Sequence, residues 1–217
     1  MGAYVNNANV KTILETLEAL PHRVKLVAVT KYVDIKATNE IIATGVTRIA
    51  ENRIEVAMGK IPELLPCEKH FIGQIQSNKL RRIVSDFDVI QSVGEIEHLQ
   101  KINAMAKAIG KKINVFLQFN ISNEKQKNGF LKNDLPAIIN IVPNIDYISI
   151  IGVMGMASQT DNHDTIRNQF HDLKIIRDTF KKKFPNIQEL SMGMSNDYKI
   201  ALEEGSTMVR IGSFLFH

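Results

Sequence analysis

Short runs of apolar, largely β-branched residues alternate along this chain with segments whose apolar residues recur at three- and four-residue spacing. The first pattern is typical of buried strands in parallel sheets, and the second of amphipathic helices. The strands are predicted over 24–31, 46–52, 69–73, 89–93, 113–120, 147–156, 189–193 and 209–216. The helices are predicted over 9–20, 34–45, 54–58, 77–84, 96–109, 136–142, 166–180 and 195–202.

Capping residues support several of the predicted helix boundaries. Asp34, Ser77 and Ser195 are residue types that accept hydrogen bonds from the first free N–H groups of a helix. Gly110 follows the apolar stripe of 96–109 and suits the left-handed residue after a helix end. The chain therefore contains eight predicted strands with a helix between each strand and the next, and the extra helix 9–20 in front of the first strand completes eight helix–strand units.

This alternation predicts parallel pairing, and eight units predict a closed (β/α)8 TIM barrel formed by one domain over residues 1–217. An open, doubly wound sheet is the alternative. That fold opens with a GxGxxG turn after its first strand, and the chain has no such turn there. Gly152-Val153-Met154-Gly155 fits the motif poorly and favours a tight bend.

Composition narrows the class of protein. The chain has 217 residues with 44% hydrophobic and 23% charged residues, which excludes a disordered protein. The net charge of +4 comes from scattered basic residues, so we expect no nucleic-acid partner. Cys67 is the single cysteine, no apolar run could span a bilayer, and residues 1–11 lack a signal-peptide pattern. We therefore expect a cytoplasmic protein without a membrane partner or a metal site.

Lys31 is the first candidate for chemistry, because it ends the apolar run 24–31. A lysine at a strand end usually extends its amine to solvent. The alternative is a partly desolvated amine that condenses with a carbonyl group. Tyr32, the next residue, is expected on the opposite face of the strand.

The loops after the seventh and eighth strands offer a candidate phosphate site. Ser195 is predicted at a helix start, where free N–H groups attract anions, and Gly212 and Ser213 add further donors. Barrels of this class often hold phosphate in these two loops. Taken alone, Ser195 is best interpreted as a helix cap and Gly212 as a bend in the chain. Because both lie in the two loops where barrels often bind phosphate, the combination favours an anion site.

Arg210 lies within the apolar eighth strand, which neighbours the first strand in a closed barrel. We therefore expect Arg210 and Lys31 to approach each other across the mouth. The alternative is a salt bridge from Arg210 to Glu203 or Glu204 on the barrel wall.

With these residues in place, the chain resembles the pyridoxal phosphate homeostasis proteins, which have a barrel like the N-terminal domain of alanine racemase. The resemblance extends in order over nearly the whole chain. The matching stretches are Ala28-Val29-Thr30-Lys31, Glu51-Asn52, 70–79 (HFIGQIQSNK), 124–129 (EKQKNG), 190–197 (LSMGMSND) and 205–212 (GSTMVRIG).

The resemblance implies a PLP fold type III-like barrel that binds pyridoxal 5′-phosphate (PLP). Lys31 takes the Schiff-base position, and Arg210 faces the pyridine nitrogen, where it would keep that nitrogen unprotonated and weaken the electron sink. Ser195, Gly212 and Ser213 take phosphate-binding positions, and Asn52 lines the ring. The implied cofactor-binding set is Lys31, Asn52, Met194, Ser195, Arg210, Gly212 and Ser213.

The resemblance also favours a carrier over an enzyme, and no catalytic residue is assigned. Alanine racemase needs a tyrosine from a second domain, and no residues follow the eighth strand to build one. We expect a monomer that binds PLP and related B6 vitamers and hands PLP to apo-enzymes, without robust turnover. The alternatives are a PLP-dependent racemase-like enzyme and a phosphosugar barrel enzyme without PLP.

Overall fold

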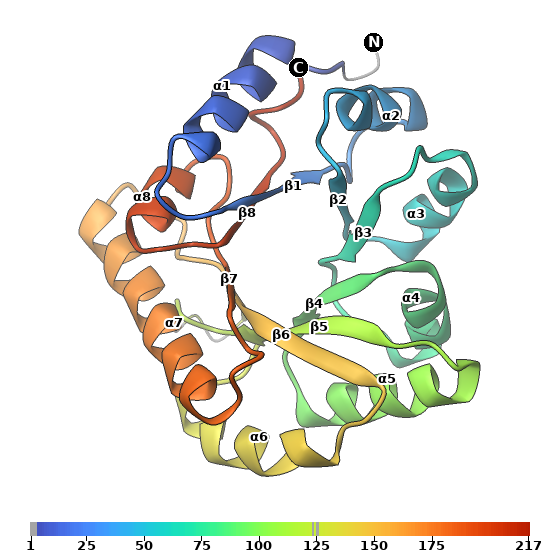
Figure 1. The fold of residues 1–217 in the computed structure, drawn as a ribbon, viewed down its shortest axis with the longest axis vertical. Coiled ribbons are helices and arrows are strands. Elements are labelled where there is room, and N and C mark those ends of the chain that lie inside the picture. The colour runs from blue at the N-terminus through green and yellow to red at the C-terminus, as the bar shows by residue number, and fades with distance from the viewer. Residues whose placement is uncertain (1–3, 123, 125) are drawn as a thin grey trace.

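Eight parallel strands close into a barrel in the computed structural model, which describes residues 4–122, 124 and 126–217 (Figure 1). Each strand pairs with the next, and β8 closes the barrel by pairing with β1. The strands are β1 (Lys25–Val29), β2 (Arg48–Glu51), β3 (Glu68–Phe71), β4 (Val89–Val93), β5 (Ile113–Phe119), β6 (Ile148–Gly155), β7 (Glu189–Ser191) and β8 (Met208–Ile211). The predicted (β/α)8 barrel is confirmed, and the open sheet is wrong.

The helices surround the barrel, as Figure 1 shows. The predicted extra N-terminal helix is α1 (Asn7–Glu18). The others are α2 (Ile35–Ala43), α3 (Ile54–Lys60), α4 (Leu80–Asp86), α5 (Ile96–Ile109), α6 (Leu135–Ile141), α7 (His163–Lys183) and α8 (Tyr198–Glu203). Short 3-10 turns occupy Ile61–Glu63, Ser77–Lys79, Lys132–Asp134 and Val142–Asn144.

Capping residues explain several helix boundaries. Asp34 Oδ1 accepts a hydrogen bond from Ala37 N at 2.8 Å at the start of α2. Gly110 ends α5 in the left-handed conformation with φ of 65°. The expectation that Ser77 caps a helix is wrong, because a 3-10 turn intervenes before α4 begins and the Ser77 hydroxyl instead accepts a hydrogen bond from Lys101.

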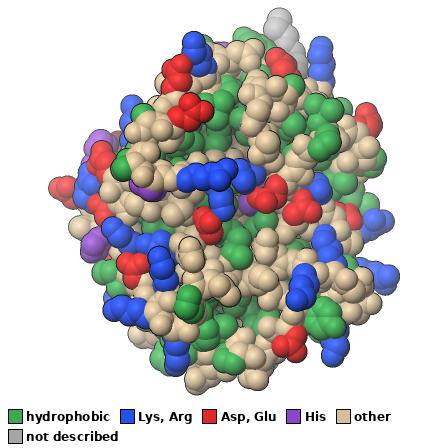
Figure 2. Space-filling model, in the orientation of Figure 1, with side chains coloured by type: hydrophobic (Ala, Val, Ile, Leu, Met, Phe, Trp, Pro, Cys, Tyr) green, Lys and Arg blue, Asp and Glu red, His purple; other side chains and the backbone are tan. Residues whose placement is uncertain are grey.

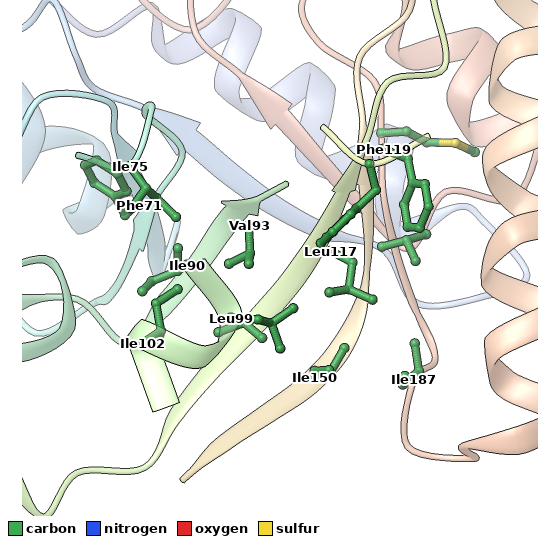
Figure 3. Packing of buried hydrophobic residues seen from close by; sticks show 14 of the residues in the cluster. Phe71, Ile75, Ile90, Val93, Leu99, Ile102, Leu117, Phe119, Ile150 and Ile187 are labelled. Carbon is green, nitrogen blue, oxygen red and sulfur yellow. The ribbon is translucent and has the colours of Figure 1, made fainter. Parts of the chain in front are cut away.

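Alternate strand residues fill the barrel interior or pack against the helices. The apolar interior layer consists of Val27, Ala50, Val89, Phe116, Met154 and Met208. A larger cluster lies between the strands and the helices, and Figure 3 shows the part of it where β4 and β5 pack near α5. A third cluster joins α1 to β1, β8 and α8. The helices thus pack against the outer side of the strands, and the carboxyl ends of the strands remain available to form a binding site.

The two strands at the closure are shorter than predicted. β1 ends at Val29 because the chain turns at Thr30, whose carbonyl accepts a hydrogen bond from Val33 N at 3.1 Å. β8 ends before Gly212, whose carbonyl accepts a hydrogen bond from Leu215 N at 2.8 Å. Both strands therefore end in turns at the same end of the barrel.

A buried ion pair fixes the chain just before Lys31. Lys60 Nζ donates to Glu51 Oε1 at 2.7 Å and to Thr30 O at 2.8 Å. Thr30 Oγ1 also donates to Glu51 Oε1, at 2.7 Å. The Lys60 and Glu51 side chains are only 8% and 4% exposed. Lys60, the last residue of α3, lies outside the barrel and anchors the turn that carries Lys31.

Charges on the surface are mixed in sign. Figure 2 shows Lys and Arg side chains interspersed with Asp and Glu across the visible face, with apolar patches between them. Exposed ion pairs such as Lys101–Glu97 contribute little to stability. In the part of the chain that is described, no helix has the length and apolar character that crossing a membrane requires.

Replacing Lys60 with methionine should lower the free energy of unfolding by about 3 kcal/mol, because the Glu51 carboxylate would stay buried without its partner. The measurement is urea unfolding followed by circular dichroism. The matched control is Lys101→Met, which breaks an exposed pair and should cost less than about 0.5 kcal/mol. Equal losses in the two variants would show that the buried pair does not anchor the turn.

Candidate functional site

Lys31 lies beyond the carboxyl end of β1, in the turn that follows the strand. Its side chain reaches over the Tyr32 ring, with Nζ 4.9 Å from the ring centroid. Tyr32 is 80% exposed. The expectation that Tyr32 lies on the opposite strand face from Lys31 is wrong, because both residues lie in the turn. The lysine amine is thus held at the rim of the mouth beside an aromatic ring.

Arg210 lies within β8 and is 3% exposed. Its Nη1 donates to Ser191 Oγ at 2.6 Å, and its Nη2 donates to Gly155 O at 3.0 Å. It forms no ion pair with any carboxylate among the described residues. Burial lowers the pKa of the guanidinium to about 10, although the charge of the Asp197 carboxylate opposes this effect. A buried cation without a paired anion is costly for stability, which marks this position as a candidate for ligand binding.

The expected alternative for Arg210, a salt bridge to Glu203 or Glu204, is wrong. Both carboxylates pair with Arg167 of α7 instead. The β1–β8 register pairs Arg210 with Val27, so Arg210 lies on the strand next to the one that leads to Lys31. A direct approach of the two side chains stays a prediction.

The loops after β7 and β8 meet at the same end of the barrel. Ser195 Oγ accepts hydrogen bonds from Gly212 N at 3.3 Å and from Phe214 N at 3.4 Å. Gly212 also lies close to β1, since a Cβ there would be 3.4 Å from Val29 Cβ and 3.5 Å from Val29 O. Ser213 is exposed next to Gly212. The structure thus brings Ser195 and Gly212 together beside the strand that precedes Lys31.

Ser195 is not a helix cap, contrary to expectation. α8 begins at Tyr198, and the preceding Asp197 is its N-cap residue. Asp197 Oδ1 accepts a hydrogen bond from Met194 N at 2.5 Å, and burial raises the pKa of this carboxyl group. Met194 itself is 37% exposed. Any anion site here is therefore built from loop hydroxyl and N–H groups and not from a helix start.

Asn52 directly follows β2 and is partly exposed at the same end. The backbone of the next loop lies very close to it, because a Cβ on Gly73 would be 1.9 Å from Asn52 O. Only glycine fits at residue 73 for this reason. The loop after β3 therefore packs tightly against the residue expected to line the ring.

Three buried polar side chains in the barrel interior are missing from the sequence-based set. His70, Gln91 and Ser191 are each 0% exposed and lie on β3, β4 and β7. Ser191 Oγ lies 2.7 Å from Gln91 Oε1, and Gln91 Nε2 lies 2.7 Å from His70 Nδ1. The signal that could have found them is a polar residue at an inward position of an apolar strand. Arg210, which donates to Ser191, is thus hydrogen-bonded to a continuous row of buried polar side chains.

A cavity of about 170 Å³ extends the mouth at the ends of β3 to β6. It is lined by Ile72, Gly73, Gln74, Ile75, Ser92, Gly94, Glu95, His98, Gln118, Lys127, Asn128 and Met156. The hydroxyl of Ser92 is buried without a hydrogen-bond partner among the described residues. Lys127 and Asn128 belong to the matching stretch 124–129, in which Lys125 lies outside the described residues.

Comparison with known proteins places this chain in a family. The family model described as "Alanine racemase, N-terminal domain" matches residues 6–217. The pyridoxal phosphate homeostasis protein of Pseudomonas aeruginosa is 36% identical over 198 residues, which cover 90% of this chain and 85% of the relative.

Solved structures give the same result. PipY of Synechococcus elongatus, in a structure with PLP bound, superposes with a TM-score of 0.87 at 28% identity and covers 96% of this chain and 100% of its own. Alanine racemase of Clostridium difficile shares the fold with a TM-score of 0.81 at 17% identity, over 98% of this chain and 57% of its own. The chain thus belongs to the family of pyridoxal phosphate homeostasis proteins, which share their barrel with the alanine racemase N-terminal domain.

Proposed function

We propose that this protein binds PLP in the mouth of the barrel, hands it on, and maintains intracellular vitamin B6 without robust turnover. The observation that carries the proposal is Arg210. Its buried guanidinium has no ion-pair partner among the described residues and lies next to the strand that leads to Lys31. A ligand that accepts a hydrogen bond from this cation would compensate its burial.

The donor set suits the chemistry of PLP, which has an aldehyde, a pyridine nitrogen and a phosphate. When bound, PLP supplies an aldehyde that reacts with primary amines and a ring that withdraws electrons. Lys31 is the amine proposed to bond to the aldehyde. Arg210 would donate a hydrogen bond to the ring nitrogen and keep it unprotonated, which weakens electron withdrawal by the ring.

The remaining residues would hold the ends of the cofactor. We assign the phosphate to the loops that meet at Ser195 and Gly212, where hydroxyl and N–H groups converge, with Met194 and Ser213 beside them. Backbone N–H groups and hydroxyls are the usual ligands of phosphate in such loops. Asn52, at the end of β2, is proposed to line the ring.

The non-catalytic part of the proposal rests on the relatives. Those that match most of the chain are named for PLP homeostasis. Alanine racemase shares only the fold at 17% identity, so its activity does not transfer to this chain. Tyr32, which contacts the Lys31 side chain, is mostly exposed to solvent, whereas an efficient acid–base group is usually held in a fixed position. Apo forms of PLP-dependent enzymes are the proposed recipients, and the cytoplasm is the proposed location.

Replacing Lys31 with alanine should abolish the covalent attachment of PLP. The purified wild-type protein incubated with PLP and then reduced with borohydride should carry one label on the peptide that contains Lys31. The label should be absent in Lys31→Ala and unchanged in the control Lys36→Ala, which removes an exposed lysine of α2. A label that persists in Lys31→Ala would overturn this assignment.

Replacing Ser195 with alanine should weaken PLP binding roughly tenfold, because a hydrogen bond to a charged phosphate is lost. Pyridoxal, which lacks the phosphate, should bind both proteins equally. Titrations followed by absorbance measure both affinities, and Ser85→Ala on α4 is the control at an exposed serine. An equal loss of affinity for both vitamers would place the phosphate elsewhere.

The carrier proposal predicts slow exchange of the α-proton of alanine in deuterated water in the presence of the PLP-loaded protein. Proton NMR measures this exchange, and the same protein after borohydride reduction gives the background rate. A rate well above that background, sustained over many turnovers, would favour the racemase-like alternative.

A further inference from the structure

Hydrogen bonds link the bottom of the barrel to Arg210 without a break. Glu68 Oε1 lies 2.7 Å from His70 Nε2, and His70 Nδ1 lies 2.7 Å from Gln91 Nε2. The other end of the Gln91 amide, Oε1, lies 2.7 Å from Ser191 Oγ, which lies 2.6 Å from Arg210 Nη1. These five residues, which we call the axial chain, come from β3, β4, β7 and β8.

The two ends of the axial chain fix the direction of every bond within it. The Arg210 guanidinium can only donate, so the Ser191 oxygen accepts and its own proton goes to Gln91 Oε1. Gln91 Nε2 then donates to His70 Nδ1, which leaves the proton of the neutral imidazole on Nε2. That proton goes to Glu68, whose ionised carboxylate can only accept. Every bond therefore donates from the mouth toward the bottom.

Burial prevents water from replacing these bonds. His70, Gln91 and Ser191 are fully buried, so reversing one bond would leave an unsatisfied group at the next. The Gln91 amide is also held by a contact of 3.3 Å from Nε2 to Met208 Sδ. Chains of aligned bonds in a medium of low dielectric strengthen one another.

The neutral form of His70, which the axial chain requires, is favoured by burial, and the charged groups around the ring act in both directions. Those that face it are Glu68 on β3, Arg48 on β2 and Asp88 just before β4. Burial lowers the pKa of His70, although the hydrogen bond to Glu68 opposes this effect. The imidazole is therefore neutral near pH 7, with Nδ1 free to accept from Gln91.

We propose that Glu68, His70, Gln91 and Ser191 act as positioning residues for Arg210, and that the acceptor at Glu68 on the bottom face controls ligand affinity at the mouth. This inference rests on the proposed function, in which Arg210 meets the pyridine nitrogen. Because one N–H of Arg210 is committed to Ser191 and another to Gly155, the orientation of its remaining N–H groups is set by the protein before the ligand arrives. Glu68 contacts no part of the mouth and acts through the chain.

A purely structural role for Glu68 is the competing explanation, since it also pairs with Arg48 at 3.1 Å. Two variants separate the explanations. Glu68→Ala removes both the ion pair and the acceptor for His70. Glu68→Gln removes the ion pair but keeps an oxygen that accepts from His70 Nε2.

The experiment measures the PLP affinity of Glu68→Ala, Glu68→Gln and the control Asp88→Ala by absorbance titration. The Asp88 carboxylate is as exposed as that of Glu68, 42% against 41%, and pairs with Lys69, but it lies outside the axial chain. We expect a loss of roughly five- to tenfold for Glu68→Ala, and less than about twofold for Glu68→Gln and for the control. Equal losses in Glu68→Ala and Glu68→Gln, or no loss in either, would overturn the proposal.

A second measurement needs no cofactor. Nitrogen-15 NMR of His70 in the wild-type protein should show a protonated Nε2 and an unprotonated Nδ1 at pH 7. The opposite tautomer or a doubly protonated ring would overturn the proposal.

Gln91→Met, which interrupts the chain, should weaken PLP binding about tenfold, whereas Ile90→Val should leave the affinity unchanged, because Ile90 lies on the same strand and packs into the outer core.

Different results would contradict the proposed function and the proposal for the axial chain. If the wild-type protein binds no PLP, the proposed function is wrong, and the NMR result still decides the direction of the axial chain. If Lys31 carries the label but the Glu68 and Gln91 variants behave like their controls, the proposed function stands and the axial chain is only structural.

Discussion

Pairing of β8 with β1 is the constraint on which the rest of the site depends. This contact closes the barrel, and its register places Arg210 beside Val27. It also places Gly212 so close to Val29, two residues before Lys31, that a Cβ on residue 212 would lie 3.4 Å from Val29 Cβ. Only this closure places the strand that leads to Lys31 next to the strand that carries Arg210 and ends before Gly212. An open sheet with the same eight strands would leave them at opposite edges.

Beside its apolar layer the barrel interior holds buried polar side chains, whereas most barrels of this kind are filled by branched apolar side chains. His70, Gln91 and Ser191 occupy positions at which valine or isoleucine would pack more favourably. Each buried polar group costs free energy unless it is hydrogen-bonded, and here each is bonded on both sides. A barrel filled with apolar side chains would therefore be more stable, but it would not fix the orientation of the buried Arg210 guanidinium.

Much of the fold could be predicted from the sequence, because β-branched runs and helical spacing carry the strand and helix signals directly. The β4 and α5 boundaries were predicted correctly. The end of β1 was not, because the turn at Thr30 depends on Lys60 and Glu51, which only the folded chain brings near. Ser195 was placed in the right loop with the wrong role, since a serine before a helix looks the same whether its hydroxyl caps the helix or accepts from another loop. The inward polar residues of the axial chain carry a signal in the sequence, but the bonds between them could not be predicted, because the members come from four strands.

The segment in front of β1 has a part in this arrangement that its sequence does not reveal. Asn9 of α1 donates a hydrogen bond from Nδ2 to Phe214 O at 2.8 Å, and Val5 pairs with Phe216. The loop after β8 is thus fastened by α1 on the outside and by the Ser195 hydroxyl on the inside. A loop held on two sides has little conformational entropy left to lose, so binding of the phosphate group proposed for this loop would order little additional chain.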